Sequence, residues 1–571
     1  MTFLWCLRAA IVGIVLLGAA LWHGQAEAGD TRGDVTATPN IVLIVFEDMS
    51  PRIGAFGDPV AQTPVLDSFA REAIRFPNTF TTSGVCAPSR SSLITGVHQQ
   101  TLGTHHMRTR APIAGMTGGG PIEYEAVPPP GIRAFPELLR GLGYYTTNNG
   151  KTDYQFGEPF TIWDHDVSIA EASQTPNWRG RAPGQPFFSM FNILLTHESY
   201  IWPEERESDN PLIRIVTERN RRDLADKPHI TDPASVEVPP YLPDTPVVRA
   251  DIARHYDNIA FAEQRLTTIL ALLEEDGLLD ETIVIVTTDH GDGLPRMKRS
   301  VYDSGLRVPM MIRFPDLRGA GTVDERLISF VDLAPTILGW AGGQPMSWHQ
   351  GQDFIADVAR RYIFAAHDRV DNLTDRSRAV RDDRFKYIRN YMPELAYLRP
   401  VPFRDAMPTT QEIWRLAAAG ELTPVQQRLV DPNRPREELY DIAADPHEVV
   451  NLADDPAHAA TLARMRAAMD EWIARVGDWA RVPEMQMIEA MWPGGVQPVT
   501  ATPELVMEDS AARLLSDTDG ASIAYGFGDE EPTAWYIYAG PVTVTAGQTL
   551  WAKSIRYGYA ESEVVRFEIG G

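Results

Sequence analysis

A lone cysteine, Cys86, is the side chain with the most obvious capacity for chemistry in this 571-residue chain. The other cysteine, Cys6, stands in an N-terminal segment, so a mature monomer has no internal disulfide to form. Two interpretations of Cys86 remain open from this count. A lone cysteine is commonly an inert, buried apolar residue, or its sulfur is a chemical centre.

The residues after Cys86 favour a chemical centre. Pro88 has a fixed φ and suits the first turn of a helix. A helix that continues over residues 89–95 would place residue 86 at its positive end, where an anion is stabilised. Arg90 is the natural partner for the oxygens of such an anion, through charge-assisted hydrogen bonds.

Three apolar runs predict the strands that must carry the rest of a site. Residues 40–46, 186–195 and 282–287 have the composition of buried parallel strands. Residues 64–76 and 248–274 have helical spacing of their apolar positions. Strands that alternate with helices predict an α/β fold, with a mostly parallel sheet between layers of helices. Sites in such folds form outside the carboxyl ends of the strands.

Acids and histidines follow all three predicted strands. Glu47 and Asp48 follow the first strand, His197 the second, and Asp289 and His290 the third. The oxygen-rich set suits a hard cation, and a histidine can protonate a departing alkoxide. Alone, each acid would be interpreted as a helix cap or solvated loop residue and the histidine as a packed bystander. Their shared position at strand ends favours a site.

Several motifs in order resemble type I (formylglycine-dependent) sulfatases of the alkaline-phosphatase-like superfamily. The first is the run from Cys86 to Gly96, and the second runs from Lys298 to Pro309. The resemblance covers residues 38 to about 480. It implies that a maturation enzyme oxidises Cys86 to formylglycine. One hydroxyl of the aldehyde hydrate would attack sulfur and the other would expel sulfate, which divides one difficult step into two.

The same resemblance implies one bound Ca²⁺. Its ligands would be Glu47, Asp48, Asp289 and His290, together with the residue formed from Cys86. Glu47 stands where the family usually has aspartate. Its side chain is longer by one methylene, so its reach toward the ion differs from that of an aspartate.

Four further residues match the catalytic positions of that family or depart from them. Lys151 and Lys298 match the lysines that hold sulfate oxygens, and His197 matches the histidine near the leaving-group oxygen. Asp153 occupies a position where the family has a histidine. Either Asp153 takes the role of a base or its function differs in this branch.

Two short segments leave their roles open. Each is either part of the substrate pocket or an ordinary polar loop. Their candidate residues are His105, His106 and Arg108 in the first segment, and Glu198, Tyr200 and Trp202 in the second.

The chain divides into four predicted parts. Residues 1–28 have a signal-peptide pattern, and residues 38–375 form the catalytic domain. Residues 376–492 form a smaller antiparallel-sheet subdomain. Residues 504–571 form a small β-sandwich that resembles the C-terminal module of chitobiase-type glycosidases. Such a module would either bind sugar or only pack against the catalytic domain.

The N-terminal segment predicts export. Arg8 supplies a positive charge, residues 9–22 an apolar core and residues 26–28 a small-x-small cleavage site. The chain would then be periplasmic or secreted, with no membrane span in the mature protein. An uncleaved anchor is the alternative. The net charge of −25 argues against nucleic acid, which requires a basic binding surface.

These observations together predict a sulfuric ester hydrolase that acts on a sulfated sugar. The sugar is inferred from export and the glycosidase-type appendage. A phosphonate monoester or phosphodiester hydrolase of the same superfamily is one alternative. A catalytically degenerate homologue that only binds sugar is another, and Asp153 is its only support.

Overall fold

The structure is a computed structural model. It describes residues 38–111, 119–167, 177–203, 208–356, 359–508 and 510–570. The predicted signal peptide, residues 1–28, lies outside these ranges. Within them, no helix combines the length and the apolar character that a membrane crossing requires.

A seven-stranded sheet forms the centre of the catalytic domain, with the order β2-β9-β7-β1-β6-β4-β5. Strands β7, β1, β6, β4 and β5 are mutually parallel. At one edge, β9 pairs antiparallel with β7, and β2 pairs antiparallel with β9. This confirms the predicted α/β class. The strands are β1 (Asn40–Phe46), β2 (Ile74–Arg75), β4 (Tyr145–Asn149), β5 (His165–Val167), β6 (Phe187–Ile193), β7 (Thr282–Thr288) and β9 (Met311–Arg313).

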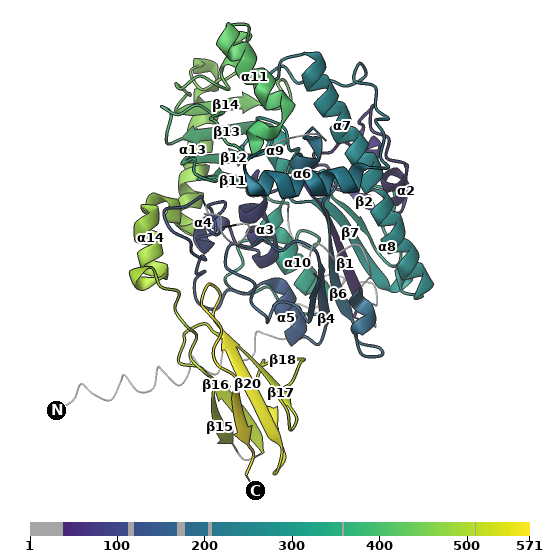
Figure 1. Cartoon of the computed structure of the whole chain (residues 1–571), viewed down its shortest axis with the longest axis vertical. Coiled ribbons are helices and arrows are strands. Elements are labelled where there is room, and N and C mark those ends of the chain that lie inside the picture. The colour runs from purple at the N-terminus through teal and green to yellow at the C-terminus, as the bar shows by residue number, and fades with distance from the viewer. Residues whose placement is uncertain are drawn as a thin grey trace, which may run out of the picture. The chain divides into compact units, whose positions relative to one another are not determined.

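Helices cover both faces of this sheet, as Figure 1 shows. Because successive side chains of a strand point to opposite faces, Ile41, Leu43 and Val45 of β1 pack on one side, and Val42 and Ile44 pack on the other. The first side is covered by α3 (Cys86–Thr95), α5 (Phe135–Gly141) and α10 (Leu333–Trp340), and the second by α2 (Pro64–Glu72) and α8 (Gln264–Glu275).

Two of the predicted helices differ from the observed ones. The helix expected over residues 64–76 ends at Glu72, because Ala73 is extended and leads into β2. The helix expected over 248–274 is two helices, α7 (Pro246–Ala262) and α8. They meet at Glu263, whose carboxylate accepts hydrogen bonds from two backbone N–H groups at the start of α2, each at 3.0 Å. The break therefore places a buried acid at a helix N-terminus, where negative charge is stabilised.

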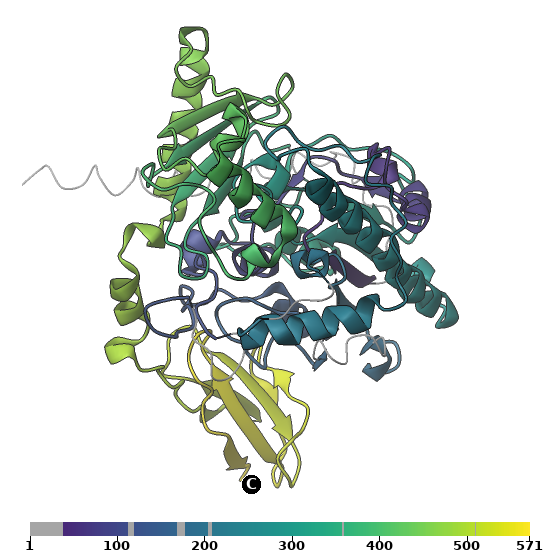
Figure 2. The ribbon, with the colours of Figure 1, turned by 45° about the horizontal axis from the view of Figure 1, so that its top comes forward.

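A second, antiparallel sheet has the order β11-β12-β13-β14. Helix α13 (Ala459–Val476) packs on it through Met465, Met469 and Trp472. This sheet begins ahead of residue 376, where the subdomain boundary was predicted. Its strands are β11 (Ile363–His367), β12 (Ser377–Arg381), β13 (Phe385–Asn390) and β14 (Glu437–Asp441), and Figure 2 gives a second view of them.

The C-terminal residues form two small antiparallel sheets around their own apolar core. The first is β15-β16-β19 and the second β18-β17-β20-β21. The bounds are β15 (Glu504–Glu508), β16 (Ala511–Leu515), β17 (Ser522–Phe527), β18 (Tyr536–Ile537), β19 (Val542–Thr543), β20 (Thr549–Ile555) and β21 (Val565–Glu568).

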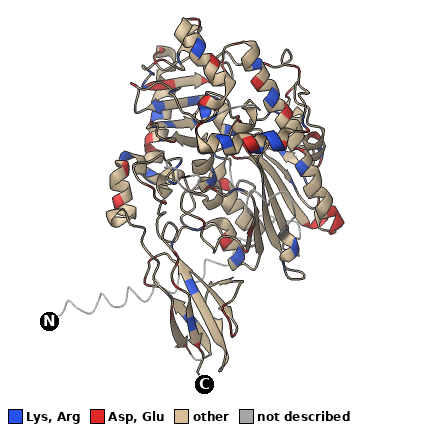
Figure 3. Ribbon diagram, viewed as in Figure 1, with Lys and Arg blue, Asp and Glu red and all other residues tan. Residues whose placement is uncertain are grey.

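Charged side chains of both signs alternate along several surface helices. Figure 3 shows red and blue next to each other along α6 (Pro211–Leu224), for example. Acidic and basic residues are therefore interspersed along the ribbon in that view. Because the net charge of the chain is −25, local cations rather than the overall field must attract an anionic substrate.

The central strand predicts a large stability cost for truncation. Leu43 is fully buried, so Leu43→Ala should lower the free energy of unfolding by about 2–5 kcal/mol. Leu515 is 43% exposed, and Leu515→Ala is the matched control, with an expected change within about 0.5 kcal/mol. Urea denaturation measures both. Equal effects of the two substitutions would contradict the assignment of β1 to the core.

Candidate active site

The carboxyl ends of the parallel strands gather the predicted site residues. Because β7, β1, β6 and β4 are adjacent in the sheet, the segments that follow them share one edge. Glu47 and Asp48 follow β1, and Asp289 and His290 follow β7. His197 comes from the segment after β6, and Lys151 from the segment after β4.

Cys86 is the first residue of α3. Val85 is the N-cap, and Cys86 is only 1% exposed. The first N–H groups of a helix lack intrahelical partners and carry partial positive charge. The Sγ atom lies 3.3 Å from Nε2 of His290. Ser89, one turn into the helix, donates a hydrogen bond to the backbone carbonyl of Asp289 at 2.5 Å. The helix start is thereby fixed to the loop after β7.

Asp48, Asp289 and His290 form a donor set beside Cys86. Their ligand atoms and Sγ of Cys86 all lie within 4.8 Å of one another, and all four residues are buried. Nδ1 of His290 lies 2.9 Å from the carbonyl of Gly291, to which it can only donate. Nε2 of His290 therefore faces the two carboxylates, 3.2 Å from Oδ1 of Asp48, and a cation that displaced its proton would bind there. A set of two carboxylates and one such nitrogen fits a divalent cation.

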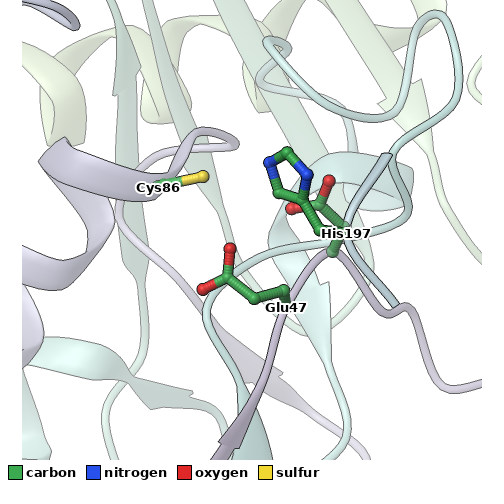
Figure 4. Close-up of side chains that lie close together, drawn as sticks. Glu47, Cys86 and His197 are labelled. Atoms are coloured by element: carbon green, nitrogen blue, oxygen red, sulfur yellow. The ribbon is translucent and has the colours of Figure 1, made fainter. Parts of the chain in front are cut away.

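Glu47 belongs to a second, overlapping group. Its ligand atoms cluster within 4.8 Å of those of Asp48, Cys86 and His197. Figure 4 shows the carboxylate of Glu47 and the ring of His197 on the side toward which the sulfur of Cys86 points. Glu47 also pairs with Arg90, and with Lys151 at 2.8 Å. Its carboxylate thus connects the donor set to the cations.

The cations of the site are buried and paired. Nε of Arg90 lies 3.1 Å from Oδ2 of Asp289. Nζ of Lys298 lies 2.7 and 2.9 Å from the two oxygens of Asp48 and 3.1 Å from Glu198. Burial alone would lower the pKa of Lys298, but the charges of Asp48, Cys86 and Glu198 raise it above its usual value. The lysine therefore stays cationic.

Asp153 forms its ion pair with Lys151 and not with a group on Cys86. Its Oδ2 is 3.5 Å from Nζ of Lys151, and its φ of 60° places it in the left-handed region. Burial would raise the pKa of Asp153, but Lys151, Arg108 and Arg90 outweigh burial and lower it below the usual value. Asp153 is therefore an anion at neutral pH.

His197 has a defined tautomer. Its Nδ1 accepts a hydrogen bond from the backbone N–H of Ser199 at 3.3 Å, at the start of a short 3₁₀ turn. In the neutral ring, the proton then resides on Nε2. Burial and the nearby Lys298 and Lys151 lower the pKa of His197 well below its usual value. The ring is neutral and can donate the Nε2 proton to an oxygen.

A cavity of about 290 Å³ opens in front of Cys86. It is lined by both charged and apolar groups. Arg299 lines it and is held by Glu198 through two hydrogen bonds of 2.8 and 2.7 Å. The other lining residues include Met107, Arg108, Asn210, Lys298, Asp371, Asn372 and Phe403.

The sequence left the roles of two segments open. Each contributes one residue to the lining of the cavity, and its other candidate residues are buried beside it. Arg108 and Glu198 line the cavity. His105 and His106 are buried with their rings 4.0 Å apart. Tyr200 donates to Asp223 at 2.7 Å, and Trp202 packs against Phe403, so the ring that lines the cavity is that of Phe403.

Sequence reasoning missed several residues of this site. Arg299 directly follows Lys298, so its place beside the pocket could have been inferred. Asn192, which accepts a hydrogen bond from Arg90 at 2.7 Å, is a polar residue inside an apolar strand, and this is also a usable signal. Asp371 and Phe403 lie in loops, and no pattern in the sequence marks them.

Two family models match the chain. The sulfatase model matches residues 39–343, and the model of the C-terminal part of N-sulphoglucosamine sulphohydrolase matches residues 296–398. Both matched regions end before the C-terminal β module, so its chitobiase-type likeness stays a prediction.

The relatives cover most of the chain. An ulvan-active sulfatase of Formosa agariphila is 41% identical over 550 residues, which is 92% of this chain and 91% of that protein. Human N-sulphoglucosamine sulphohydrolase is 26% identical over 497 residues, 80% of this chain and 94% of that protein. A solved structure bound to its substrate D-glucosamine-2-N,6-O-disulfate has a TM-score of 0.52 at 19% identity, over 77% of this chain and 98% of that chain. The last likeness shows the fold.

The family model and the 41% identical relative, together with the sheet, its helix layers and the buried cysteine among carboxylates and cations, define a hydrolase of the alkaline-phosphatase-like superfamily. The family model and the relatives specify it further. The chain belongs to the sulfatase family and is a sulfuric ester hydrolase.

The ion pair of Asp153 predicts how its substitution acts. Asp153→Asn keeps the shape and removes the charge that holds Lys151, so KM should rise roughly 10–100-fold, the value of a charge-assisted contact. Because the pKa of Asp153 is lowered, the acid limb of the pH–rate profile should keep its position. Steady-state kinetics across pH provides the measurement, with the exposed Asp316→Asn as control. A fall in kcat together with a shifted acid limb would instead make Asp153 a base.

Proposed function

We propose that this sulfatase removes sulfate from a sulfated polysaccharide, with formylglycine made from Cys86 and one Ca²⁺. The observation that supports it most strongly is the position of Cys86. Cys86 is the first residue of α3 and lines the cavity. Its Sγ atom lies within 4.8 Å of the ligand atoms of Asp48, Asp289 and His290.

The cations explain why a sulfate group would bind here in an acidic protein. Lys151 and Lys298 are 14% and 2% exposed and keep their charges, and the positive end of α3 adds to them. Fixed cations and N–H groups in a buried site stabilise the charge of a sulfuryl group without reorganisation during the reaction. Arg90 orients the carboxylates of Glu47 and Asp289.

Two groups would complete the site when present. The formylglycine hydrate would supply the nucleophilic hydroxyl, which a thiol does not replace because its sulfo adduct has no easy exit. Ca²⁺ would be held by Asp48, Asp289 and His290, with Glu47 beside them, and would supply positive charge against the sulfate oxygens.

Proton transfer to the leaving group is assigned to His197. The geometry of Nδ1 leaves the proton on Nε2, and His197 belongs to the cluster that contains Cys86. A positioned imidazole can protonate the alkoxide that departs from the sulfate ester.

The polysaccharide is inferred from the relative that acts on ulvan and from the pocket. Arg108 lines the cavity with 29% of its side chain exposed and lies 3.9 Å from Asp371, a loose ion pair. It is available to a second anionic group of a polyanionic chain, and Phe403 offers a ring to a sugar face. We further propose export of the protein, on the strength of residues 1–28.

Oxidation of Cys86 is the first consequence to test. In protein expressed together with a maturation enzyme, the tryptic peptide that contains residue 86 should be about 18 Da lighter than the cysteine form, as expected when CHO replaces CH₂SH. Mass spectrometry measures this. Cys86→Ala should abolish turnover, since loss of a nucleophile costs many orders of magnitude. Unmodified cysteine throughout a fully active preparation would refute the assignment.

The second consequence to test is the dependence of activity on a metal ion. Chelation should remove activity and lower the melting temperature, since a bound ion stabilises the folded state. Added Ca²⁺ should restore both. Elemental analysis should find one ion in the native protein, none in Asp289→Ala, and one in the control Asp316→Asn. Full activity of metal-free protein would exclude the site.

The substrate class needs a comparison of ester types. Desulfation of ulvan and other sulfated polysaccharides should exceed hydrolysis of an aryl phosphonate under the same conditions. Arg108→Ala should weaken binding of the polymer more than of 4-nitrophenyl sulfate. Faster hydrolysis of the phosphonate would contradict the proposal and would indicate a phosphonate monoester hydrolase instead.

A further inference from the structure

The C-terminal β module inserts one side chain into the core of the catalytic domain. Tyr557, just after β20, is fully buried and packs within the apolar cluster that contains Leu43 and Phe135. Its hydroxyl donates to Glu137 of α5 at 2.7 Å and accepts from the backbone N–H of Ala134 at 3.2 Å. The module is thus anchored at a buried polar contact.

The ring of Tyr557 contacts the loop that carries Lys151 and Asp153. It stacks on Phe156 with ring centroids 5.0 Å apart, and Phe156 stacks on Tyr154 at 5.5 Å. The backbone N–H of Gly558 donates to the carbonyl of Phe156 at 3.1 Å. Tyr154 directly follows Asp153. Stacked rings have preferred geometries, so a shift of the Tyr557 ring would displace Phe156 and Tyr154.

The loop of residues 150–157 has a backbone that needs such support. Four of its residues have positive φ, and two of these, Asp153 at 60° and Gln155 at 65°, are not glycine. Side chains disfavour this region, and such conformations persist only where the surroundings impose them. The carbonyl of Gln155 accepts from the N–H of Ala126 at 2.8 Å. Gly558 contacts Ala126 so closely that a Cβ would lie 2.3 Å from its carbonyl oxygen.

We infer that Tyr557 is a positioning residue of the active site. It acts through Phe156 and Tyr154 and fixes the loop that presents Lys151 and Asp153. The C-terminal module is then part of the catalytic unit rather than an independent appendage. The consequence for turnover rests on the proposed sulfate-binding role of Lys151, whereas the consequence for the loop's conformation does not.

A structural feature of the module supports this role over sugar binding. The face that points into the catalytic domain carries the buried contacts of Tyr557 and of Ser522, which also hydrogen-bonds Glu137. Its most exposed aromatic residue among the described ones, Tyr536, lies near Asp529, Glu530 and Glu531 in the sequence, and such acids would repel a sulfated chain.

The test uses the full chain and four single substitutions. Tyr557→Leu and Phe156→Leu remove the two ends of one stacking contact. Tyr525→Leu is the control, because the ring of Tyr525 packs within the module against Tyr536, with ring centroids 5.7 Å apart. Tyr557→Phe keeps the ring and removes the hydroxyl. Hydrogen–deuterium exchange of residues 150–157 reports the loop, and kcat/KM for 4-nitrophenyl sulfate reports the site.

Both leucine variants at the contact should speed exchange in residues 150–157 and lower kcat/KM by roughly 10–100-fold, as misplacement of catalytic groups does. Tyr525→Leu should remain within about twofold of the wild type in kcat/KM. Tyr557→Phe, which keeps the stacked ring, should retain more activity than Tyr557→Leu. Adding Asp153→Asn to Phe156→Leu should cost less than the product of the two single effects, since both act on one loop.

Unchanged exchange in a folded Phe156→Leu protein would overturn the inference, whatever the substrate. Equal changes in Tyr525→Leu would do the same, because the effect would then be a general loss of stability. If Tyr557→Leu does not fold, Phe156→Leu decides the matter. Faster exchange with unchanged kcat/KM would refute the positioning role and leave the proposed function intact.

Discussion

Alternating buried charges hold the edge of the main sheet in one arrangement. Carboxylates that end the strands contact cations from α3 and the neighbouring loops, and nearly all of these side chains are removed from water. Loss of one partner from such a buried pair typically costs about 3–5 kcal/mol, because the other charge remains uncompensated. The members on the acidic side are Glu47, Asp48, Glu198 and Asp289, and those on the basic side are Arg90, Lys151, Lys298 and Arg299. A dication together with a sulfate group can enter without upsetting this balance, since their charges offset each other.

The pocket above these charges depends on distant parts of the chain. The guanidinium of Arg369, just after β11 of the second sheet, donates to the carbonyl of Met107 at 3.0 Å and also to that of Asp371. It is held in turn by Glu484 at 2.8 Å, from α14 (Glu484–Met491). The second sheet therefore fixes the two loops that line the cavity, and the C-terminal module packs behind the loop of Lys151. A site on loops gains its precision from such rigid supports.

The sequence was informative where local chemistry sets the structure. A continuous apolar run predicts β1 because its residues are buried on both faces, and Pro88 predicts the start of α3. The helix over 248–274 was predicted as one because no breaker marks Glu263; only the tertiary contact to α2 explains the break. Likewise, the packing of Phe403 into the pocket and of Tyr557 under Phe156 depends on residues hundreds of positions away, and periodicity carries no such information.

The most direct test of this account is a crystal structure of the matured, calcium-loaded protein with bound sulfate. The account predicts sulfate within hydrogen-bond distance of Lys151 and Lys298, next to residue 86, and an ion in contact with Asp48 and Asp289. Contradiction would be sulfate elsewhere in the cavity, with Lys298 still bound to Asp48 and no ion between the strand ends.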